Sequence, residues 1–301
     1  MADPAANPAW TDLSRAEEVF TRVRPRLFGV AYRMAGTVTE AEDAVQETWL
    51  RWQDADRAAV TDPAAFLTTI VTRICLNVLQ SARARHETYI GPWLPEPVDT
   101  TADPALGAER AAALELATLM LLERLAPPER AAYILREAFD YPYEQIAETV
   151  GVSAPNARQL VSRARKRLTT RRVAPVTDAD QDRLLRAFVA AARSGDLDAL
   201  EEILAEDVVS YTDGNGVRNA AQIPVLGRAT VAKFVRAFRP RLWPGAALRW
   251  ITANGRSAVL VLHNDSPAAF LTVAASADGI DHVLWVLAPE KLSRIGATPE
   301  R

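Results

Sequence analysis

The stretch YEQIAETVGVSAPNARQLVSRARKRL, residues 143–168, contains two short apolar patterns at helical spacing with a glycine between them. Gly151 is suited to the left-handed position that ends a helix, and Ser153 is suited to cap the next one. The expected buried stripes consist of Ile146, Ala147 and Val150, and of Ala157, Leu160, Val161, Ala164 and Leu168. Two short helices joined by a three-residue turn with a glycine predict a helix-turn-helix.

The exposed face of the second helix is strongly basic. From Arg158 to Arg172 the sequence has seven Lys or Arg and no Asp or Glu, although the whole chain has a formal net charge of −3. Such a local cluster indicates contact with DNA, whereas a solvated basic face is the alternative. Early residues of the helix are placed to reach base edges, and later cations to meet phosphates. The expected contacts come from Ser153, Asn156, Arg158, Gln159, Ser162, Arg163, Arg165 and Lys166.

The bulk properties limit the class of protein. A chain of 301 residues is long enough for about two domains, and its single cysteine, Cys75, excludes an internal disulfide. We expect a cytoplasmic protein, because neither a signal peptide nor a transmembrane run is present. The three histidines, His86, His263 and His282, are scattered, so we expect no metal site and no cofactor.

Residues 15–86 are predicted to be helical. Thr39 and Glu42 have the spacing of a capping box at the start of EAEDAVQETWLRWQ. One face of that helix is apolar, and comprises Ala41, Val45, Thr48 and Trp52. Its other face is acidic and polar, and comprises Glu42, Asp43, Gln46, Glu47 and Leu50.

A further helix begins at Asp62-Pro63, with Asp as the cap and Pro at the first helical position. Its core face is expected to contain Phe66, Ile70, Ile74 and Val78, widened by Leu67 and Val71. Its outer face is expected to contain Thr69, Thr72, Arg73, Asn77, Gln80 and Arg83.

Four prolines then indicate a linker over 87–107, because proline is excluded from helix interiors. After a second helical block, residues from about 179 predict two helices, a strand ending in DGNGVR and a helix near Thr230–Phe238. Four short β-rich runs with Asn-Gly and Asp-Gly turns follow, so this third block is predicted to be an α+β domain.

Both helical blocks resemble the extracytoplasmic-function sigma factors of the sigma-70 family. LFGVAYRMAGTVTEAEDAVQETWLRW resembles regions 2.1–2.2, DPAAFLTTIVTRICLNVLQSARAR resembles regions 2.3–2.4, and residues 122–168 resemble region 4. GPWLPEP and the strand-rich tail are similar to a SigJ-like subgroup with a fused SnoaL-like domain. The resemblance implies a fold class of two all-α sigma domains followed by an NTF2-like (SnoaL-like) cone of helices around a curved sheet.

The expected domains are a disordered 1–14, region 2 at 15–86, a linker at 87–108, region 4 at 109–172, a linker at 173–177, the SnoaL-like domain at 178–295 and a tail at 296–301.

The resemblance also implies partners and roles. The acidic face around Asp43 would dock on the β′ clamp helices of core RNA polymerase, with the β subunit as a further contact. The basic helix would read the −35 element of promoter DNA. The −10 element would be held by Arg73, Asn77, Arg83 and Arg85. We expect a monomer that needs no separate anti-sigma factor, because in this subgroup the fused domain regulates in cis.

Three motifs are expected to form interdomain contacts. WLPEP could dock on the C-terminal domain, thread toward the polymerase active centre, or serve only as a rigid spacer. DGNGVR resembles the subgroup's DGGGK, with Asn215 in place of a glycine, and LAPEKL resembles NPDKL, with Ala288 in place of an asparagine. The residues concerned are Trp93, Leu94, Pro95, Glu96, Pro97, Asp213, Gly214, Gly216, Arg218, Pro289, Glu290, Lys291 and Leu292.

Catalysis by the third domain is not expected. Asp213, His263 and His282 are acid–base candidates by residue type alone. Trp243, Trp250 and Trp285 could line a cavity or belong to the core. The predicted function is that of a sigma factor that initiates transcription and is regulated in cis. The alternatives are a helix-turn-helix regulator that never contacts polymerase, and a ligand sensor or enzyme built on the SnoaL-like domain.

Overall fold

The computed structural model describes residues 12–86, 89–100, 115–168, 176–218, 220–293 and 295, with side chains omitted at 80–86. The chain forms two compact units, one of Met1–Ala84 with Leu121–Thr170 and one of Arg85–Met120 with Arg171–Arg301. The expected tail at 296–301, most of the expected 1–14 segment, and Arg171 and Arg172 lie outside the described residues. The domain boundaries derived from the sequence stay predictions.

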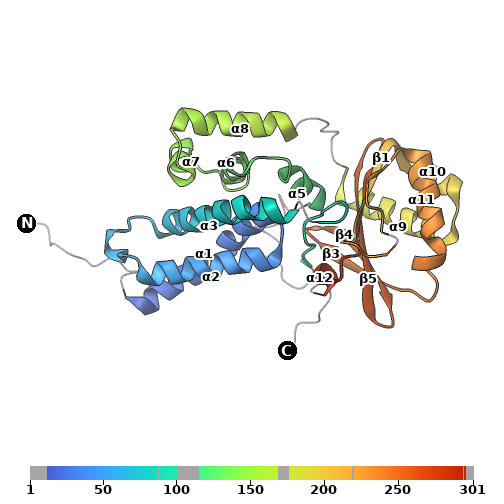
Figure 1. Cartoon of the computed structure of the whole chain (residues 1–301), viewed down its shortest axis with the longest axis horizontal. Helices are drawn as coiled ribbons and strands as arrows, with labels where there is room; N and C mark the ends of the chain where they lie inside the picture. Colours follow the sequence, from blue (N-terminus) through green and yellow to red (C-terminus); the bar gives the residue numbers. More distant parts are fainter. Residues whose placement is uncertain are drawn as a thin grey trace, which may run out of the picture. The chain divides into compact units, whose positions relative to one another are not determined.

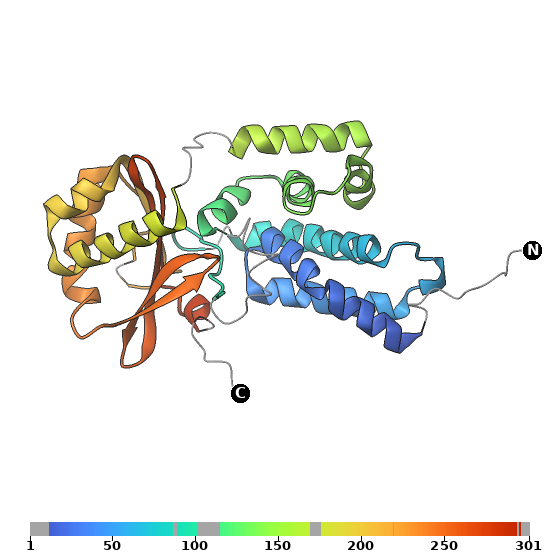
Figure 2. The same ribbon diagram turned by 180° about the vertical axis from the view of Figure 1, so that it is seen from behind.

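The first unit begins with three helices, α1 (Leu13–Ala35), α2 (Val38–Asp54) and α3 (Pro63–His86), with a short 3-10 turn, η1 (Arg57–Ala59), before α3. They lie side by side in both views (Figures 1 and 2). The capping box expected at Thr39 and Glu42 is wrong, because α1 ends at Gly36 and α2 starts at once. Thr37 caps α2 instead, accepting a 3.3 Å bond from the Glu40 amide.

The face that α3 buries differs from the expected one. Asp62 caps the helix as predicted, since its carboxylate accepts from the amides of Ala64 and Ala65. The buried residues are Leu67, Thr68, Val71, Thr72, Ile74 and Cys75, whereas Phe66, Ile70 and Val78 are only half-buried. The core stripe is therefore rotated, and two threonines take part in it.

Four more helices follow, α5 (Leu116–Leu122), α6 (Pro127–Glu137), α7 (Tyr143–Val150) and α8 (Ala154–Leu168). The last three share one apolar core that includes Leu135, Ile146 and Val161. A buried Arg130 guanidinium ties α6 to α1 by donating to the Met34 carbonyl oxygen at 2.6 Å. The two helical blocks thus pack together within the first unit.

The second unit is the predicted α+β arrangement. Helices α9 (Asp178–Ser194) and α10 (Leu197–Ile203) precede strand β1 (Leu204–Asp213), and α11 (Arg228–Leu242) follows β2 (Val225–Leu226). The remaining elements are β3 (Ala247–Ala253), β4 (Arg256–His263), β5 (Ser266–Ser276), β6 (Gly279–Val286) and α12 (Pro289–Leu292). The strand order is β2-β1-β6-β5-β4-β3, in which only the β1–β6 pair is parallel.

The two faces of this sheet have different covers. Helices α9, α10 and α11 lie on one face, and α12 lies on the other (Figures 1 and 2). The helix-covered face forms a core that includes Phe188, Val231 and Val283. The other face forms a second core in which Leu94 and Leu116, from outside the sheet, take part. Because strand side chains alternate, neighbouring residues of one strand serve the two cores separately.

Gly279 in the β5–β6 turn offers a test of this packing. Its φ is +114°, and a Cβ there would lie 2.7 Å from the Ile203 carbonyl oxygen, whereas Gly245, with φ +71°, has nothing within 4 Å of such an atom. Both Gly→Ala changes add left-handed strain, but Gly279→Ala also adds a backbone clash. We expect Gly279→Ala to lower the free energy of unfolding by about 1–3 kcal/mol more than Gly245→Ala. Equal unfolding midpoints in urea would contradict this packing.

Candidate functional site

The helix-turn-helix has the predicted geometry. Gly151 has φ +76° and donates its N–H to the Ala147 carbonyl, which ends α7. Ser153 accepts a long hydrogen bond, 3.4 Å, from the Asn156 amide at the start of α8. The stripe of Ala157, Leu160, Val161 and Ala164 is buried, and Leu168 is half-buried. The opposite face of α8 is therefore turned to solvent.

The residues expected to contact the −35 element lie on this open face or at the N-cap before it. Asn156 is half-buried, and the exposed members are Ser153, Arg158, Gln159, Ser162, Arg163, Arg165 and Lys166. Residues 158–172 contain no acid, but acids on other helices reach the cations of α8. Glu144 pairs with Arg158 at 3.2 Å, Glu137 with Arg165 at 2.6 Å and Glu129 with Arg167 at 2.5 Å.

These ion pairs divide the basic face into two groups. Arg158, Arg165 and Arg167 are partly neutralised by acids on α6 and α7, and the hydrogen bond that Arg165 donates to Glu137 raises the pKa of Arg165. Among the described residues, Arg163 and Lys166 have no ion-pair partner. The three arginines stay 52–56% exposed. Glu144 and Glu137 are 68% and 32% exposed, so their ion pairs are weak, about 0–1 kcal/mol each, whereas Glu129 is only 6% exposed. A polyanion can therefore displace Glu144 and Glu137 at small cost.

The acidic face of α2 is accessible as predicted. Asp43, Gln46 and Leu50 are exposed, and Leu50 is among the large apolar side chains most open to solvent, at 49%. Glu42 pairs with Arg24 at 2.5 Å and Glu47 with Arg51 at 2.9 Å. The other side of the helix is buried through Ala41, Val45, Thr48 and Trp52. An exposed leucine among carboxylates is suited to a protein partner with a basic, partly apolar surface.

The outer face of α3 is partly covered in this structure. Arg73 donates to the carbonyl oxygens of Glu148 and Thr149, at 2.8 and 3.2 Å, where α7 ends. The hydroxyls of Thr69 and Thr149 lie 3.1 Å apart. Asn77 is exposed. Arg83 and Arg85 lie in the last turns of α3, where side chains are outside the described part of the chain.

The linker docks on the second unit through a buried carboxylate. Asp213, at the end of β1, is fully buried and accepts the Leu94 amide at 2.7 Å. The Lys291 ammonium of α12 donates to Asp213 at 2.6 Å and to the Leu94 carbonyl oxygen at 2.5 Å. Tyr89 donates its hydroxyl to the other Asp213 oxygen. We call Tyr89, Leu94, Asp213 and Lys291 the linker lock.

The charges of the linker lock are shielded from water. Burial lowers the pKa of Lys291, while the Asp213 carboxylate opposes that change. Burial and then the hydrogen bond to Asp213 raise the pKa of Tyr89. The Lys291 nitrogen also lies 4.3 Å from the centre of the Trp93 ring, within cation–π range. Sequence reasoning missed Tyr89, whose sole signal was an aromatic side chain shortly before WLPEP.

The rest of the linker adds backbone and apolar contacts. Leu94, Pro95, Glu96 and Pro97 are buried, and Leu94 packs in one core with Leu292. Residues 98–100 then run along the end of β3, where the Thr100 amide donates to the Thr252 carbonyl oxygen at 2.8 Å. Of the three uses considered for WLPEP, this structure displays docking on the C-terminal domain.

The loop after β1 explains why an asparagine can stand in place of the subgroup's glycine at Asn215. Asn215 has φ +41°, a left-handed conformation that asparagine tolerates, so it can replace a glycine. Gly214 cannot be replaced as easily, since a Cβ would lie 2.3 Å from that of Ala220. Asn215 donates to Glu290 at 2.9 Å, and Pro289 begins α12. Gly216 and Arg218 are exposed.

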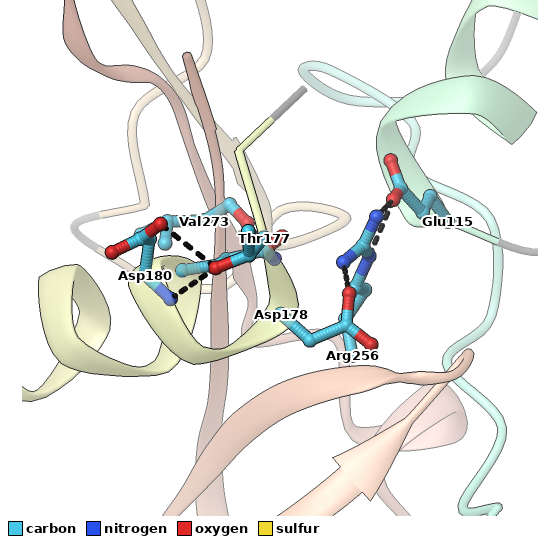
Figure 3. Close-up of polar contacts among 7 residues, drawn as sticks. Glu115, Thr177, Asp178, Asp180, Arg256 and Val273 are labelled. Carbon is cyan, nitrogen blue, oxygen red and sulfur yellow. Dashed lines mark hydrogen bonds and ion pairs between the residues drawn. The ribbon is translucent and has the colours of Figure 1, made fainter. Parts of the chain in front are cut away.

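A second ion-pair cluster holds the chain directly before α5. The Arg256 guanidinium at the start of β4 lies between the carboxylates of Glu115, just before α5, and Asp178, the first residue of α9, and pairs with both (Figure 3). Thr177 caps α9 beside it, and its hydroxyl donates to Asp180 at 2.7 Å. Arg256 is largely buried, so this pairing fixes where the chain leaves the sheet domain toward α5.

Comparisons with known proteins agree with this architecture. Residues 19–85 match the family model for sigma-70 region 2, and residues 115–168 match that for sigma-70 region 4. The ECF RNA polymerase sigma factor SigJ of Mycobacterium tuberculosis (strain ATCC 25618 / H37Rv) is 41% identical over 75% of this chain and 74% of its own length. This chain belongs to the ECF sigma factors of the sigma-70 family.

Further relatives match more than nine-tenths of this chain. The probable ECF RNA polymerase sigma factor SigI of M. tuberculosis (strain CDC 1551 / Oshkosh) is 32% identical over 91% of this chain and 93% of its own length. The crystal structure of M. tuberculosis SigJ superposes with a TM-score of 0.75 at 33% identity, covering 94% of this chain and all of that one. The predicted fold class, two helical sigma domains and a SnoaL-like α+β domain, is confirmed.

The acid–base candidates in the C-terminal domain of this sigma factor do not converge. Asp213 is engaged in the linker lock, and His282 stacks on Tyr211 on the same side of the sheet. His263 lies on the opposite face, with its Nε2 3.0 Å from the Leu242 carbonyl oxygen. Trp243 and Trp285 line a cavity, which is one of the two arrangements expected for the tryptophans. Trp250 instead lies against the guanidinium of Arg186.

Two negative findings complete the site. No group of His, Cys, Asp and Glu side chains in the described part of the sigma factor is arranged to hold a metal ion. No described helix combines the length and the apolar character that crossing a bilayer requires.

Replacing Asp213 tests the linker lock. Asp213→Asn keeps the shape of the side chain but leaves the buried Lys291 ammonium without its carboxylate, so we expect a loss of about 3–5 kcal/mol in the free energy of unfolding. Lys291→Met in the same chain should restore part of that loss. Asp265→Asn, at an exposed turn position, is the matched control and should be neutral. Urea unfolding measures all three, and an Asp213→Asn variant as stable as the control would contradict the lock.

Proposed function

We propose that this sigma factor directs core RNA polymerase to promoters by reading the −35 element with α8 and the −10 element with α3. The C-terminal unit would modulate this activity in cis through its hold on the linker. The observation that carries the proposal is the open basic face of α8, which lies within the segment matched to sigma-70 region 4. The protein would act in the cytoplasm as a monomer, without a separate anti-sigma factor and without catalysing a reaction.

The proposed −35 contacts follow the direction of α8. Asn156, Arg158 and Gln159 lie in its first two turns, where a recognition helix reaches base edges in the major groove. Arg163, Arg165 and Lys166 lie further along the helix and would meet phosphates. DNA would compete with Glu144 and Glu137 for Arg158 and Arg165, so these acids act as weak, displaceable counter-charges.

Reading the −10 element requires a change in the first unit. Among the described candidates for the −10 element, Arg73 is already bonded within the protein, because it donates to two carbonyl oxygens at the end of α7. The negative end of the α7 dipole also favours the guanidinium there. We infer that α7 must leave α3 before Arg73 can meet DNA, so the packed unit is a resting form of the protein.

The proposed polymerase contact is the exposed side of α2. Asp43, Gln46 and Leu50 lie on this face without burial, and Glu42 and Glu47 flank it. Carboxylates around one apolar side chain would complement the basic clamp helices of the β′ subunit, and the β subunit would contact the protein elsewhere.

The C-terminal unit would act through the linker lock. Releasing residues 93–97 would expose apolar surface and leave Asp213 and Lys291 without the Leu94 backbone. That cost favours the docked linker in the free protein, and a partner that takes up the linker would have to offset it. The C-terminal unit would therefore set how freely the linker moves between the two DNA-binding blocks.

Run-off transcription with purified core polymerase tests the function as a whole. We expect a promoter-dependent product with the full chain and an altered product level with Asp213→Asn, at unchanged binding of a −35 duplex. The alternative function, a helix-turn-helix regulator with a sensing or enzymatic domain, predicts duplex binding but no core polymerase binding and no transcript. Absence of any promoter-dependent product would remove the proposal.

Charge reversal on α2 tests the polymerase contact. Asp43→Arg should weaken association with core polymerase by about tenfold or more, because like charges then face each other across the interface. Asp56→Arg makes the same change at an exposed site beyond α2 and should have little effect. Fluorescence anisotropy measures the affinity of both variants for core polymerase. Equal affinities would show that α2 does not contact the polymerase.

The salt dependence of DNA binding tests the roles along α8. Lys166→Ala should reduce the slope of log K against log salt by about 0.9 without changing sequence preference, since one phosphate contact is lost. Arg158→Ala should cost about 1–3 kcal/mol on the correct −35 duplex and much less on a scrambled one. The opposite pattern would mean that the two roles are exchanged.

A further inference from the structure

A cavity of about 210 Å³ lies on the helix-covered side of the C-terminal sheet. Its walls come from β1, β4, β5, β6, α11 and the loop after β1. An engineered apolar cavity of about 150 Å³ in another protein holds benzene, so this one has room for a ring with a short substituent. Nothing in the roles given above to the sigma factor uses this space.

Most of the wall is apolar and aromatic. Helix α11 contributes Phe234, Val235, Phe238 and Leu242, and Trp243 follows directly after it. Phe234 and Phe238 contact each other with ring centres 4.8 Å apart, and Trp243 packs edge-on against Trp285. Walls of this kind are typical of sites for small organic molecules, in which few polar groups fix the orientation.

Two buried polar groups in the wall lack partners. The indole N–H of Trp285 and the hydroxyl of Thr212 have no hydrogen-bond partner within the described chain, although the residues are only 6% and 3% exposed. An unsatisfied buried donor costs about 1–3 kcal/mol, so native folds rarely keep one without a reason. An indole N–H can only donate, which means that it requires an acceptor.

The charged groups of the wall have one sign. Arg218 and Arg241 line the cavity and are exposed, and neither has an ion-pair partner in the part of the chain that the structure describes. No Asp or Glu is among the lining residues. Guanidinium groups pair with carboxylates in a planar, two-bond geometry, so an anionic ligand is favoured over a cationic one.

We propose that this cavity binds a small carboxylic acid with an apolar ring or short chain. The apolar body packs against Phe234 and Phe238, and the carboxylate takes the charge of Arg218 and Arg241 with Trp285 and Thr212 as donors. Binding itself does not depend on the role of the chain in transcription.

The cavity shares a segment with the linker lock. Thr212 faces the cavity, and the next residue, Asp213, faces the linker, because strand neighbours alternate between faces. Leu287 also lines the cavity, and its amide donates to the Asp213 carbonyl oxygen at 2.7 Å. A ligand in the cavity would therefore contact the same strand ends that hold the linker.

Calorimetry on the full chain with three matched probes tests the proposal. We expect saturable binding of phenylacetate, weaker binding of the neutral phenylacetamide and none of the cationic 2-phenylethylamine. Trp285→Phe removes the N–H donor together with part of the ring from the wall, and should weaken phenylacetate binding about tenfold or more. Arg241→Ala should weaken it about two- to fivefold. Arg236→Ala, at an exposed position on the same helix but outside the cavity, should leave it unchanged.

Three results would overturn the proposal. The first is no saturable phenylacetate binding with a Kd below about 10 mM, a free energy near −3 kcal/mol. The second is equal affinity for the acid and the amine. The third is unchanged binding in both Trp285→Phe and Ala268→Phe, since the added ring of the latter would fill the cavity.

Discussion

A carboxylate that is fully buried must have its charge and its lone pairs matched, and Asp213 sets this constraint for the C-terminal half of the molecule. Its partners come from two segments far apart in sequence, the linker through Leu94 and Tyr89, and α12 through Lys291. Removing any of these partners would leave the buried Asp213 carboxylate without one of its hydrogen bonds or without its counter-charge. The linker therefore belongs to the C-terminal unit, and in the proposed function this hold on the linker would let the sheet domain modulate the DNA-binding blocks.

Because side chains alternate along β1 and β6, the sheet has two different surfaces, one facing the linker and one facing the cavity. Asp213 and Val286 face the linker side, while Thr212 and Trp285 face the cavity under α11. Adjacent residues of one strand face the linker and the cavity. A displacement of the strand ends would therefore move the linker-binding surface and the cavity wall together. The helices cover one face, and the linker supplies the apolar cover that the other face needs.

Local patterns predicted much of this from sequence. Gly151 and the apolar stripes gave the helix-turn-helix, and the Asn-Gly and Asp-Gly turns separated the strands, because these features depend on neighbours within a few residues. The α3 face was misjudged because Thr68 and Thr72 bury their hydroxyls by donating to carbonyl oxygens one turn earlier, which makes a polar residue acceptable in a core. From the sequence, Thr72 is expected on the outer face of this helix only because threonine is polar.

What sequence reasoning could not reach depends on contacts between distant segments. The acids that pair with α8 lie on α6 and α7, so a count along the helix itself missed Glu129, Glu137 and Glu144. The hydrogen bond from the Leu94 amide to Asp213 joins residues 119 positions apart, and hydrophobic periodicity along the sequence predicts no contact at that separation. The residue types of the lock were visible in the motifs, but their arrangement around one carboxylate was not.

Amide hydrogen exchange over residues 93–98 of the full chain tests the central claim most directly. The linker lock predicts that the Leu94 amide is strongly protected in the unaltered protein and exchanges much faster in Asp213→Asn, while amides in α2 keep their rates. A Leu94 amide that exchanges as fast as an unstructured peptide in the unaltered protein, or at the same slow rate in both, would contradict a linker held by the buried carboxylate.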